Sequence, residues 1–255
     1  MNRKILISIV TIATFLIARK LKYFWAYAVF GKDEWNLMDE RITSSILVYS
    51  QIVLVLIVCF LLFKKDIFKS LGLDRGIGKG FLVGLIATVP MIIGYAFIND
   101  INLGMDLHVW HKDFVLAGFF EEFMFRGFLF GILFYYAGWG FIPAIVIPSF
   151  YFGIGHLYQA NTFGESVNVF VFTGLASAGF AWFYTAWRNL WVVVFLHAFM
   201  DLIWDVFQIE TNVAGDMMVN LFRFTTLGLM IFLSIRNLNA HPEYSLKNKW
   251  WLNKG

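Results

Sequence analysis

Hydrophobic residues occur along the chain in eight long runs, which short polar stretches separate. A helix needs about 20 apolar residues to cross a hydrocarbon core about 30 Å thick. The pattern therefore predicts eight transmembrane helices, over residues 5–30, 42–63, 80–98, 113–135, 141–157, 166–187, 190–209 and 217–235. The first run is the least regular, because Arg19, Lys20 and Lys22 interrupt it.

The composition agrees with a chain that lies mostly in lipid. Its 255 residues are 60% hydrophobic and 15% charged, whereas soluble domains have about 45–50% apolar and about 25% charged residues. We therefore expect an all-α, polytopic integral membrane protein whose surroundings are the lipid bilayer. The small net charge of +3 and the lack of a basic run argue against nucleic acid as a partner. A single cysteine, Cys59, excludes a disulfide framework.

Lysine and arginine in the loops predict the orientation of the chain. Residues 64–79 and the tail over 236–254 are rich in these residues, whereas residues 99–112 hold only Lys112. Basic loops remain on the cytoplasmic side of a membrane. With an even number of spans, both termini are therefore expected in the cytoplasm.

Ionisable residues inside the predicted spans gather on a few of them. Such a group costs about 2.5–3.5 kcal/mol or more at the centre of a bilayer, so each one is a functional-site hypothesis. Counted from the predicted ends, groups on three helices reach one layer of the membrane, which packing alone explains poorly. They are Glu121, Glu122 and Arg126 on the fourth segment, His156 at the end of the fifth, and His197 and Asp201 on the seventh.

Spacing separates the roles of the residues on the fourth segment. Glu122 and Arg126 are four residues apart and face the same way, which predicts a charge-neutralising pair within the helix. Glu121 is turned by about 100° from Glu122 and stays free. His197 and Asp201 repeat the four-residue spacing on their own helix.

Two further patterns concern packing between helices. Asp205 and Arg223 lie at a similar depth on consecutive helices, and we expect them to form a structural ion pair. Small residues four apart predict close helix contacts on the third and fourth segments. These are Gly80 with Gly84, and Gly127 with Gly131.

Three short motifs resemble those of the CPBP intramembrane proteases, also called the Abi or CAAX-protease family. Residues 121–126 read EEFMFR and match EExxxR, residues 152–156 read FGIGH and match FxxxH, and residues 197–201 read HAFMD and match HxxxN/D. The family includes the eukaryotic CAAX prenyl endopeptidase and bacterial bacteriocin-processing and self-immunity proteins. The resemblance implies a four-helix catalytic core over 113–209, between N-terminal helices over 1–112 and a last helix with its tail over 210–255.

The resemblance also implies roles for the matching residues. Glu121 would be the base that activates water, assisted by His156, and peptide hydrolysis would proceed without a covalent acyl-enzyme. His197 and Asp201 would stabilise the oxyanion that forms on the scissile carbonyl. Position 201 is often Asn in the family, and an Asp donates a hydrogen bond only when it is protonated.

The remaining motif residues, Glu122, Arg126 and Phe152, are expected to support the site. Zinc held by Glu121, His156 and His197 is an alternative, but the HExxH spacing is absent from the sequence. We therefore predict that no metal or other cofactor takes part.

The leading functional prediction is an intramembrane endopeptidase that cuts a membrane-associated peptide or protein. A precursor peptide, a bacteriocin or pheromone leader, and a CAAX-like tail are the substrate classes that fit. One alternative is a non-catalytic immunity or scaffold protein that keeps the motif residues for stability. A proton- or metal-coupled transporter is less favoured, because the sequence has no visible internal repeat.

Overall fold

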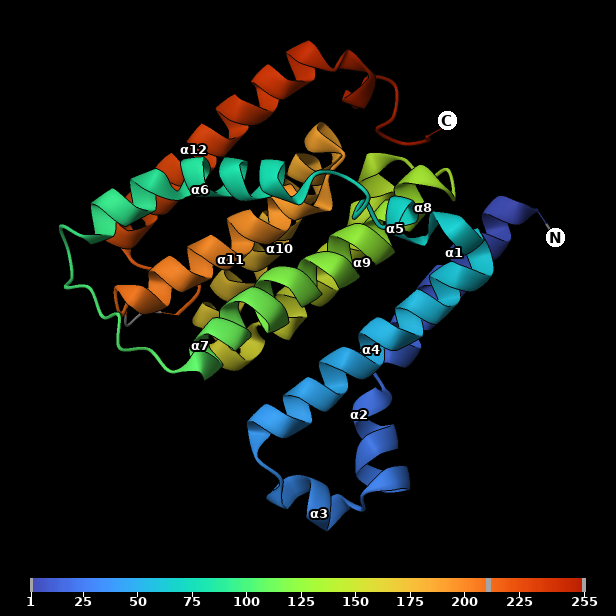
Figure 1. Ribbon diagram of the computed structural model, residues 1–255, viewed down its shortest axis with the longest axis horizontal. Helices are drawn as coiled ribbons and strands as arrows, with labels where there is room; N and C mark the ends of the chain where they lie inside the picture. The colour runs from blue at the N-terminus through green and yellow to red at the C-terminus, as the bar shows by residue number, and fades with distance from the viewer. Residues whose placement is uncertain (1, 210–211, 254–255) are drawn as a thin grey trace.

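The computed structural model describes residues 2–209 and 212–253, and this part of the chain is helical without a strand (Figure 1). The all-α class is therefore confirmed. The elements are α1 (Arg3–Ala18), α2 (Leu21–Tyr23), the π-helix η1 (Phe24–Val29), α3 (Lys32–Leu37), α4 (Glu40–Phe63), the 3₁₀-helix η2 (Lys64–Asp66), α5 (Ile67–Ser70), α6 (Ile77–Tyr95), α7 (Leu107–His111), the π-helix η3 (Lys112–Phe130), α8 (Gly131–Tyr135), α9 (Phe141–Gly155), the 3₁₀-helix η4 (Leu157–Gln159), α10 (Phe163–Trp187), α11 (Leu190–Val206), α12 (Met217–Ala240) and the 3₁₀-helix η5 (Pro242–Tyr244).

Five helical segments are long and apolar enough to cross a membrane, and they support an integral membrane protein. They are Glu40–Ser70, Ile77–Tyr95, Phe141–Gln159, Phe163–Trp187 and Met217–Ala240. Helices α1 and α11 have 16 and 17 residues, which is short for a span. The number of eight spans therefore stays a prediction.

The first predicted span is wrong in its extent. Instead of one helix over residues 5–30, α1 ends at Ala18 and the chain continues through the short helices α2 and η1. The guanidinium of Arg19 lies 5.1 Å from the ring centre of Tyr151, and the ammonium of Lys20 lies 5.3 Å from that of Tyr23. The adjacent charged side chains of Arg19 and Lys20 are unfavourable in an apolar environment, and the helix ends directly before them.

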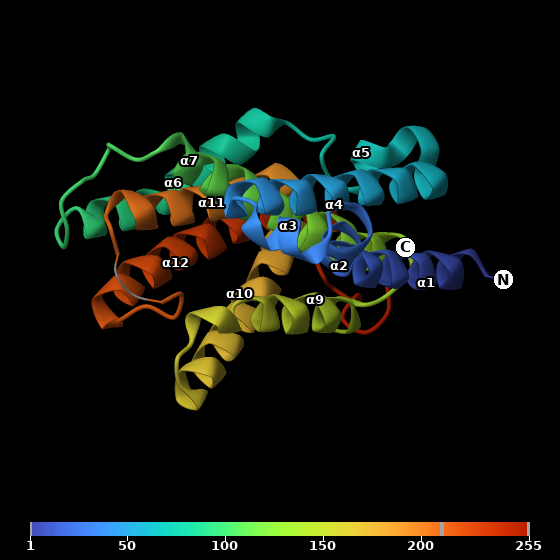
Figure 2. The ribbon, with the colours of Figure 1, turned by 90° about the horizontal axis from the view of Figure 1, so that it is seen from below.

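Helix α11 lies in the middle of the helices that carry the site. Figure 1 shows α7, η3 and α8 following one another as a single green helix beside α11, and α6 runs along α11 as well. As predicted, Gly80 and Gly84 are close-packing positions: a methyl group on either would lie 2.6 Å and 2.9 Å from atoms of α11. Figure 2 shows the first turns of α10 extending away from the other helices.

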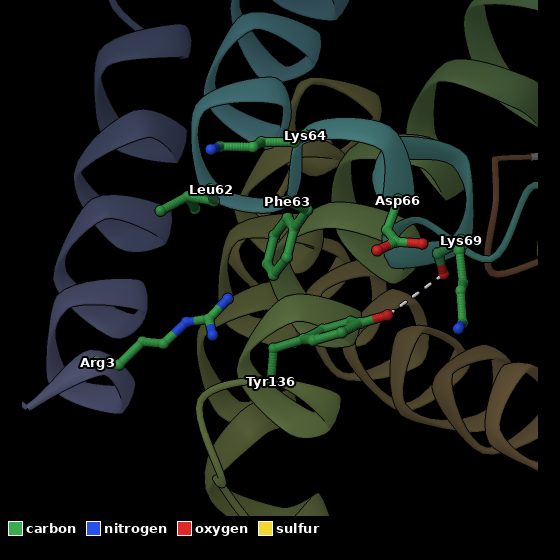
Figure 3. Close-up of a pocket in the computed structure, with 7 residues that line it drawn as sticks. All are labelled: Arg3, Leu62, Phe63, Lys64, Asp66, Lys69 and Tyr136. Atoms are coloured by element: carbon green, nitrogen blue, oxygen red, sulfur yellow. Dashed lines mark hydrogen bonds between the residues drawn. The ribbon is translucent and has the colours of Figure 1, made fainter.

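Both ends of the chain pack against the turn between α8 and α9. The Trp139 indole donates to the Ser8 hydroxyl at 2.9 Å, and the backbone N–H of Asn253 donates to the Gly138 carbonyl at 3.1 Å. The basic loop also reaches this turn, where the Tyr136 hydroxyl donates to the Lys69 carbonyl at 3.4 Å beside a small pocket (Figure 3). The termini thus lie on one side of the molecule, and their cytoplasmic location stays a prediction.

Candidate active site

One cavity of about 720 Å³ collects the side chains that the motifs single out. Its walls come from η3, the end of α9, and helices α10, α11 and α12. The motif residues that line it are Glu121, Arg126, Phe152, His156, His197 and Asp201. Glu122 lies behind His197 and is fully buried.

The helix that carries the two glutamates differs from the expected α-helix. Over Lys112–Phe130 it has the wide hydrogen-bonding pattern of a π-helix, which is rare at this length and in short form often marks functional sites. It approaches α11 closely at Gly118, where a methyl group would lie 2.5 Å from the Cβ of Ala198. Because Ala198 follows His197, this contact brings the glutamates against the imidazole.

Glu122 links two helices through a single oxygen. Its Oε1 accepts from the Arg126 guanidinium at 2.9 Å, as the spacing predicts, and from Nδ1 of His197 at 2.7 Å. A carboxylate oxygen only accepts, so Nδ1 of His197 carries a proton. The contact to His197 was not predicted. It joins η3 to α11, and the spacing of residues along one helix carries no information on contacts between helices.

The other nitrogen of His197 faces the two remaining carboxylates. Its Nε2 lies 3.5 Å from Oδ2 of Asp201 and 4.0 Å from Oε2 of Glu121. That oxygen of Glu121 is buried and accepts no hydrogen bond from the described residues. Glu121 therefore keeps an unpaired acceptor 4.0 Å from the ring that Glu122 orients.

His156 is fixed through its own helix. It directly follows the last residue of α9, and its Nδ1 lies 2.8 Å from the Phe152 carbonyl. The last carbonyls of a helix lack partners within it, and a carbonyl oxygen only accepts, so Nδ1 is the donor here. In the neutral ring Nε2 is then an acceptor. His156 makes no direct hydrogen bond to Glu121 or His197 among the described residues.

Two phenylalanine rings pack against the Arg126 guanidinium of the site. The Arg126 guanidinium lies 4.6 Å from the ring centre of Phe152 and 5.3 Å from that of Phe180. Phe180 also meets the His197 ring edge to face at 5.5 Å. The supporting role of Phe152 stays a prediction. Phe180 on α10 was missed, because the chain has thirty Phe and none stands out by sequence.

The expected ion pair between Asp205 and Arg223 is wrong. Asp205 binds Lys112 instead, with 2.6 Å between Oδ2 and Nζ, and the same ammonium lies 3.4 Å from buried Asp113. Arg223 donates to the Val213 carbonyl at 2.7 Å. The depth estimate placed both residues at one level, but it carried no information on the direction in which each side chain turns.

The donors at this site do not form a ready metal centre. Over the described residues, no three His, Cys, Asp or Glu side chains are grouped as a metal ion requires. In addition, Glu122 already occupies Nδ1 of His197.

Comparison with known family models gave a match over the region that holds the site. Residues 106–203 match the family model described as type II CAAX prenyl endopeptidase Rce1-like. Neither the curated proteins nor the solved structures gave a match to the chain. The matched region holds every motif residue named above and confirms the resemblance to the CPBP and CAAX proteases. Over residues 106–203 the chain is therefore similar to this Rce1-like family, a likeness that supports a CAAX-type intramembrane protease, a peptide hydrolase.

Proposed function

We propose that the protein is an intramembrane endopeptidase in which Glu121 activates water for attack on a peptide bond. The observation that carries this proposal is the shared cavity: Glu121, His156, His197 and Asp201 all line it, although they come from three separate helical segments. A general base needs an acceptor that is not already occupied, and Oε2 of Glu121 receives no hydrogen bond from the described residues.

His156 is proposed to hold the same water. Its Nδ1 donates to the Phe152 carbonyl, so its Nε2 is free to accept a hydrogen bond from the water. This hydrogen bond orients the water so that a lone pair of the water oxygen faces the substrate carbonyl. Little entropy is lost in ordering the His156 ring during the reaction, because its hydrogen bond to the backbone already fixes the ring.

His197 and Asp201 are proposed to stabilise the oxyanion. Since Nδ1 of His197 is already directed at Glu122, donation to an oxyanion through Nε2 requires the doubly protonated ring. Asp201 contributes a second donor when it is protonated, and otherwise it orients His197 across their 3.5 Å contact.

The proton balance closes within these groups. Glu121 takes a proton from water as the hydroxide oxygen bonds to the carbonyl carbon and the carbonyl electrons move onto the oxygen. Collapse of the oxyanion breaks the C–N bond, and Glu121 returns its proton to the leaving nitrogen. The products are a carboxyl terminus and an amine.

The lining of the cavity favours a substrate that is itself associated with the membrane. Besides the charged groups, the cavity is lined by apolar side chains of α10 and α12, which include Leu175, Phe183 and Leu227. Such a lining suits an apolar peptide segment or a lipid-modified tail. A CAAX-like tail, a precursor peptide, and a bacteriocin or pheromone leader all have this character.

The proposal is tested by Glu121→Gln in purified protein, with Glu40→Gln as the matched control. Glu40 lies in the first turn of α4, exposed and outside the cavity. Cleavage of a farnesylated CAAX-tail peptide and of its unmodified form is followed in detergent micelles. Loss of a general base slows hydrolysis by about 10²–10⁴-fold, so we expect this loss for Glu121→Gln and none for Glu40→Gln.

Other outcomes contradict the proposal in distinct ways. Cleavage by Glu121→Gln at the wild-type rate removes Glu121 from the mechanism. A cellular phenotype that survives Glu121→Gln at normal protein levels, with no cleavage by the wild type, favours the scaffold function. Ion flux that depends on Glu121 favours transport.

Metal independence forms part of the same proposal. We expect activity to persist after treatment with a strong chelator and removal of the chelator complex. Loss of cleavage that zinc restores would overturn this expectation and assign Glu121, His156 and His197 as ligands.

A further inference from the structure

A second pocket lies between the N-terminal helices and the turn that follows α8. Its volume is about 310 Å³, at the lower end of the range of about 300–1,000 Å³ for small-molecule sites. Three parts of the chain form it, as Figure 3 shows: α1, the end of α4 with the loop after it, and the turn at Tyr136. It shares no lining residue with the cavity of the candidate active site.

Three cations line this pocket without a partner among the described residues. Arg3 begins α1, Lys64 directly follows α4, and Lys69 lies on α5. No carboxylate of residues 2–209 and 212–253 lies within 4.0 Å of their charged nitrogens. The lining contains one carboxylate, Asp66, so positive charge is in excess. Because like charges repel, an anion from outside the chain would stabilise this arrangement.

Helix stability does not account for all three cations. Lys64 and Lys69 stand at the C-terminal ends of helices, where a positive charge is favourable. Arg3 stands at the N-terminus of α1, where the free N–H groups make a positive charge unfavourable. A further reason is therefore needed for the meeting of Arg3 with the two lysines.

The loop that carries the two lysines is held at the pocket. It begins with a sharp turn at Lys64, where φ is +53°, a value that residues other than glycine rarely adopt. The Tyr136 hydroxyl donates to the Lys69 carbonyl at 3.4 Å, and the Tyr136 ring lies 4.8 Å from that of Phe63. In Figure 3, Arg3 and Lys64 lie on one side of the Phe63 ring and Lys69 on the other. The positive groups thus come from separate segments around one space.

A phosphate group is the anion that fits such a space. Its oxygens accept charge-assisted hydrogen bonds from several donors at once. Arginine and lysine both bind phosphate, the first through its fork of N–H groups and the second as a point charge.

The apolar surroundings of the pocket indicate that the phosphate belongs to a lipid. Leu62 and Phe63 lie in its wall. Nearby, Ile5 on α1 and Leu61 on α4 are 53% and 71% exposed, and the two helices are neighbours. Helix α4 is long and apolar enough to cross a membrane, so side chains on its exposed face meet acyl chains. A free phosphate ion would gain nothing from these apolar side chains.

We propose that this pocket binds the phosphate of an anionic glycerophospholipid through Arg3, Lys64 and Lys69. The acyl chains lie along the exposed apolar faces of α1 and α4. The loop over 64–79 is on the side expected to be cytoplasmic, where basic pockets between membrane helices bind anionic headgroups. The inference goes beyond the proposed peptidase function and does not depend on it. It assigns a lipid that joins the N-terminal helices to the turn after α8.

The test measures binding of phosphatidylglycerol with short acyl chains to delipidated protein in a nonionic detergent. Phosphatidylcholine with the same chains is the comparison, because it carries a phosphate but no net charge. A basic side chain near a membrane surface corresponds to about fivefold in affinity. We therefore expect Arg3→Gln, Lys64→Gln and Lys69→Gln each to weaken phosphatidylglycerol binding by about fivefold. Equal binding of the two lipids by the wild type overturns the proposal.

Lys65 is the matched control that separates a pocket from a diffuse basic surface. It follows Lys64 directly and is exposed like it, but it does not line the pocket. Lys65→Gln should therefore change the affinity by less than about twofold, well below the loss for a cation at the headgroup. Equal losses in Lys65→Gln and Lys64→Gln would assign the effect to diffuse charge and overturn the proposal.

Asp66 provides a variant with the opposite sign. It is the carboxylate of the pocket, and Asp66→Asn removes a charge that repels the phosphate. Phosphatidylglycerol should then bind about fivefold more tightly. Weaker or unchanged binding contradicts the placement of the headgroup beside Asp66.

Inorganic phosphate and glycerol phosphate identify the source of the anion. Both lack the acyl chains that contact α1 and α4, so they should bind at least about tenfold more weakly than phosphatidylglycerol. Inorganic phosphate that binds as tightly as phosphatidylglycerol would show a site for a soluble anion and overturn the lipid assignment.

Thermal unfolding gives a readout that needs neither cleavage nor a peptide. Arg3, Lys64 and Lys69 are exposed, so the single variants should unfold near the wild-type temperature without lipid. Phosphatidylglycerol should raise the unfolding temperature of the wild type and of Lys65→Gln, and should raise that of Arg3→Gln less. An equal rise in all variants overturns the proposal. Loss of peptidase activity does not affect this result, so the two functions fail independently.

Discussion

Glu122 binds both Arg126 and His197 through one oxygen, and separating these two contacts is the sharpest test of the site. The exposed fractions of Glu122 and Arg126 are 0% and 1%. Removing one partner of a buried ion pair costs about 3–5 kcal/mol, because the other charge stays buried without compensation. Glu122→Gln keeps the shape of the side chain and removes the charge, so we expect a destabilisation of about this size.

A second substitution should recover the stability. Arg126 lies between the rings of Phe152 and Phe180, and methionine fills such aromatic surroundings well. Removing both members of a buried ion pair leaves no charge buried without compensation. The double variant Glu122→Gln with Arg126→Met is therefore expected to unfold near the wild-type temperature.

Activity should not recover with it. His197 loses its carboxylate acceptor in both variants, and a weaker amide acceptor leaves the ring poorly oriented and uncharged. Loss of one oxyanion donor costs about 10²–10³-fold in kcat. Thermal unfolding in detergent and the kcat for peptide cleavage are measured for each variant, with Glu40→Gln as control. A double variant that regains both stability and activity would refute the assignment of an orienting role to Glu122.

Three further predictions concern single contacts. Asp201→Asn is expected to keep or raise activity, because the amide can donate to an oxyanion, whereas Asp201→Leu should lower kcat by about 10²-fold. Gly118→Ala should destabilise the protein by about 1–3 kcal/mol through overpacking, while Gly228→Ala, with open space at its Cβ, should not; thermal unfolding compares them. Asp205→Lys should lower stability, and the reversed pair with Lys112→Asp should restore it, since these side chains are 2.6 Å apart.

Contacts within one helix were predictable from the sequence. The four-residue spacing of Glu122 and Arg126 required only the helical period, and their ion pair has the expected partners. The same period placed His197 and Asp201 together. It succeeded at Glu122 even though the helix there is a π-helix, because a residue four positions away remains a neighbour in either geometry.

Contacts between helices were not predictable in the same way. The bond from Glu122 to His197 depends on how η3 and α11 are shifted and rotated against each other. That arrangement follows from small residues such as Gly118, whose effect appears only when the facing helix is known. The same limit explains Asp205, which pairs with Lys112 on η3 instead of Arg223 on α12.

The contacts between η3 and α11 that could not be predicted from the sequence all help to hold the reacting groups in place. Glu122 binds His197 deep in the site, Lys112 binds Asp205 toward the end of α11, and Gly118 keeps the two helices in close contact between them. Each pair resists sliding in both directions, because its partners sit on different helices and a shift would break a charge-assisted bond. The candidate base, adjacent to Glu122, is thereby held against the imidazole. Precise placement of reacting groups is a large part of catalysis, so these pairs position the chemistry although neither of them takes a proton from water.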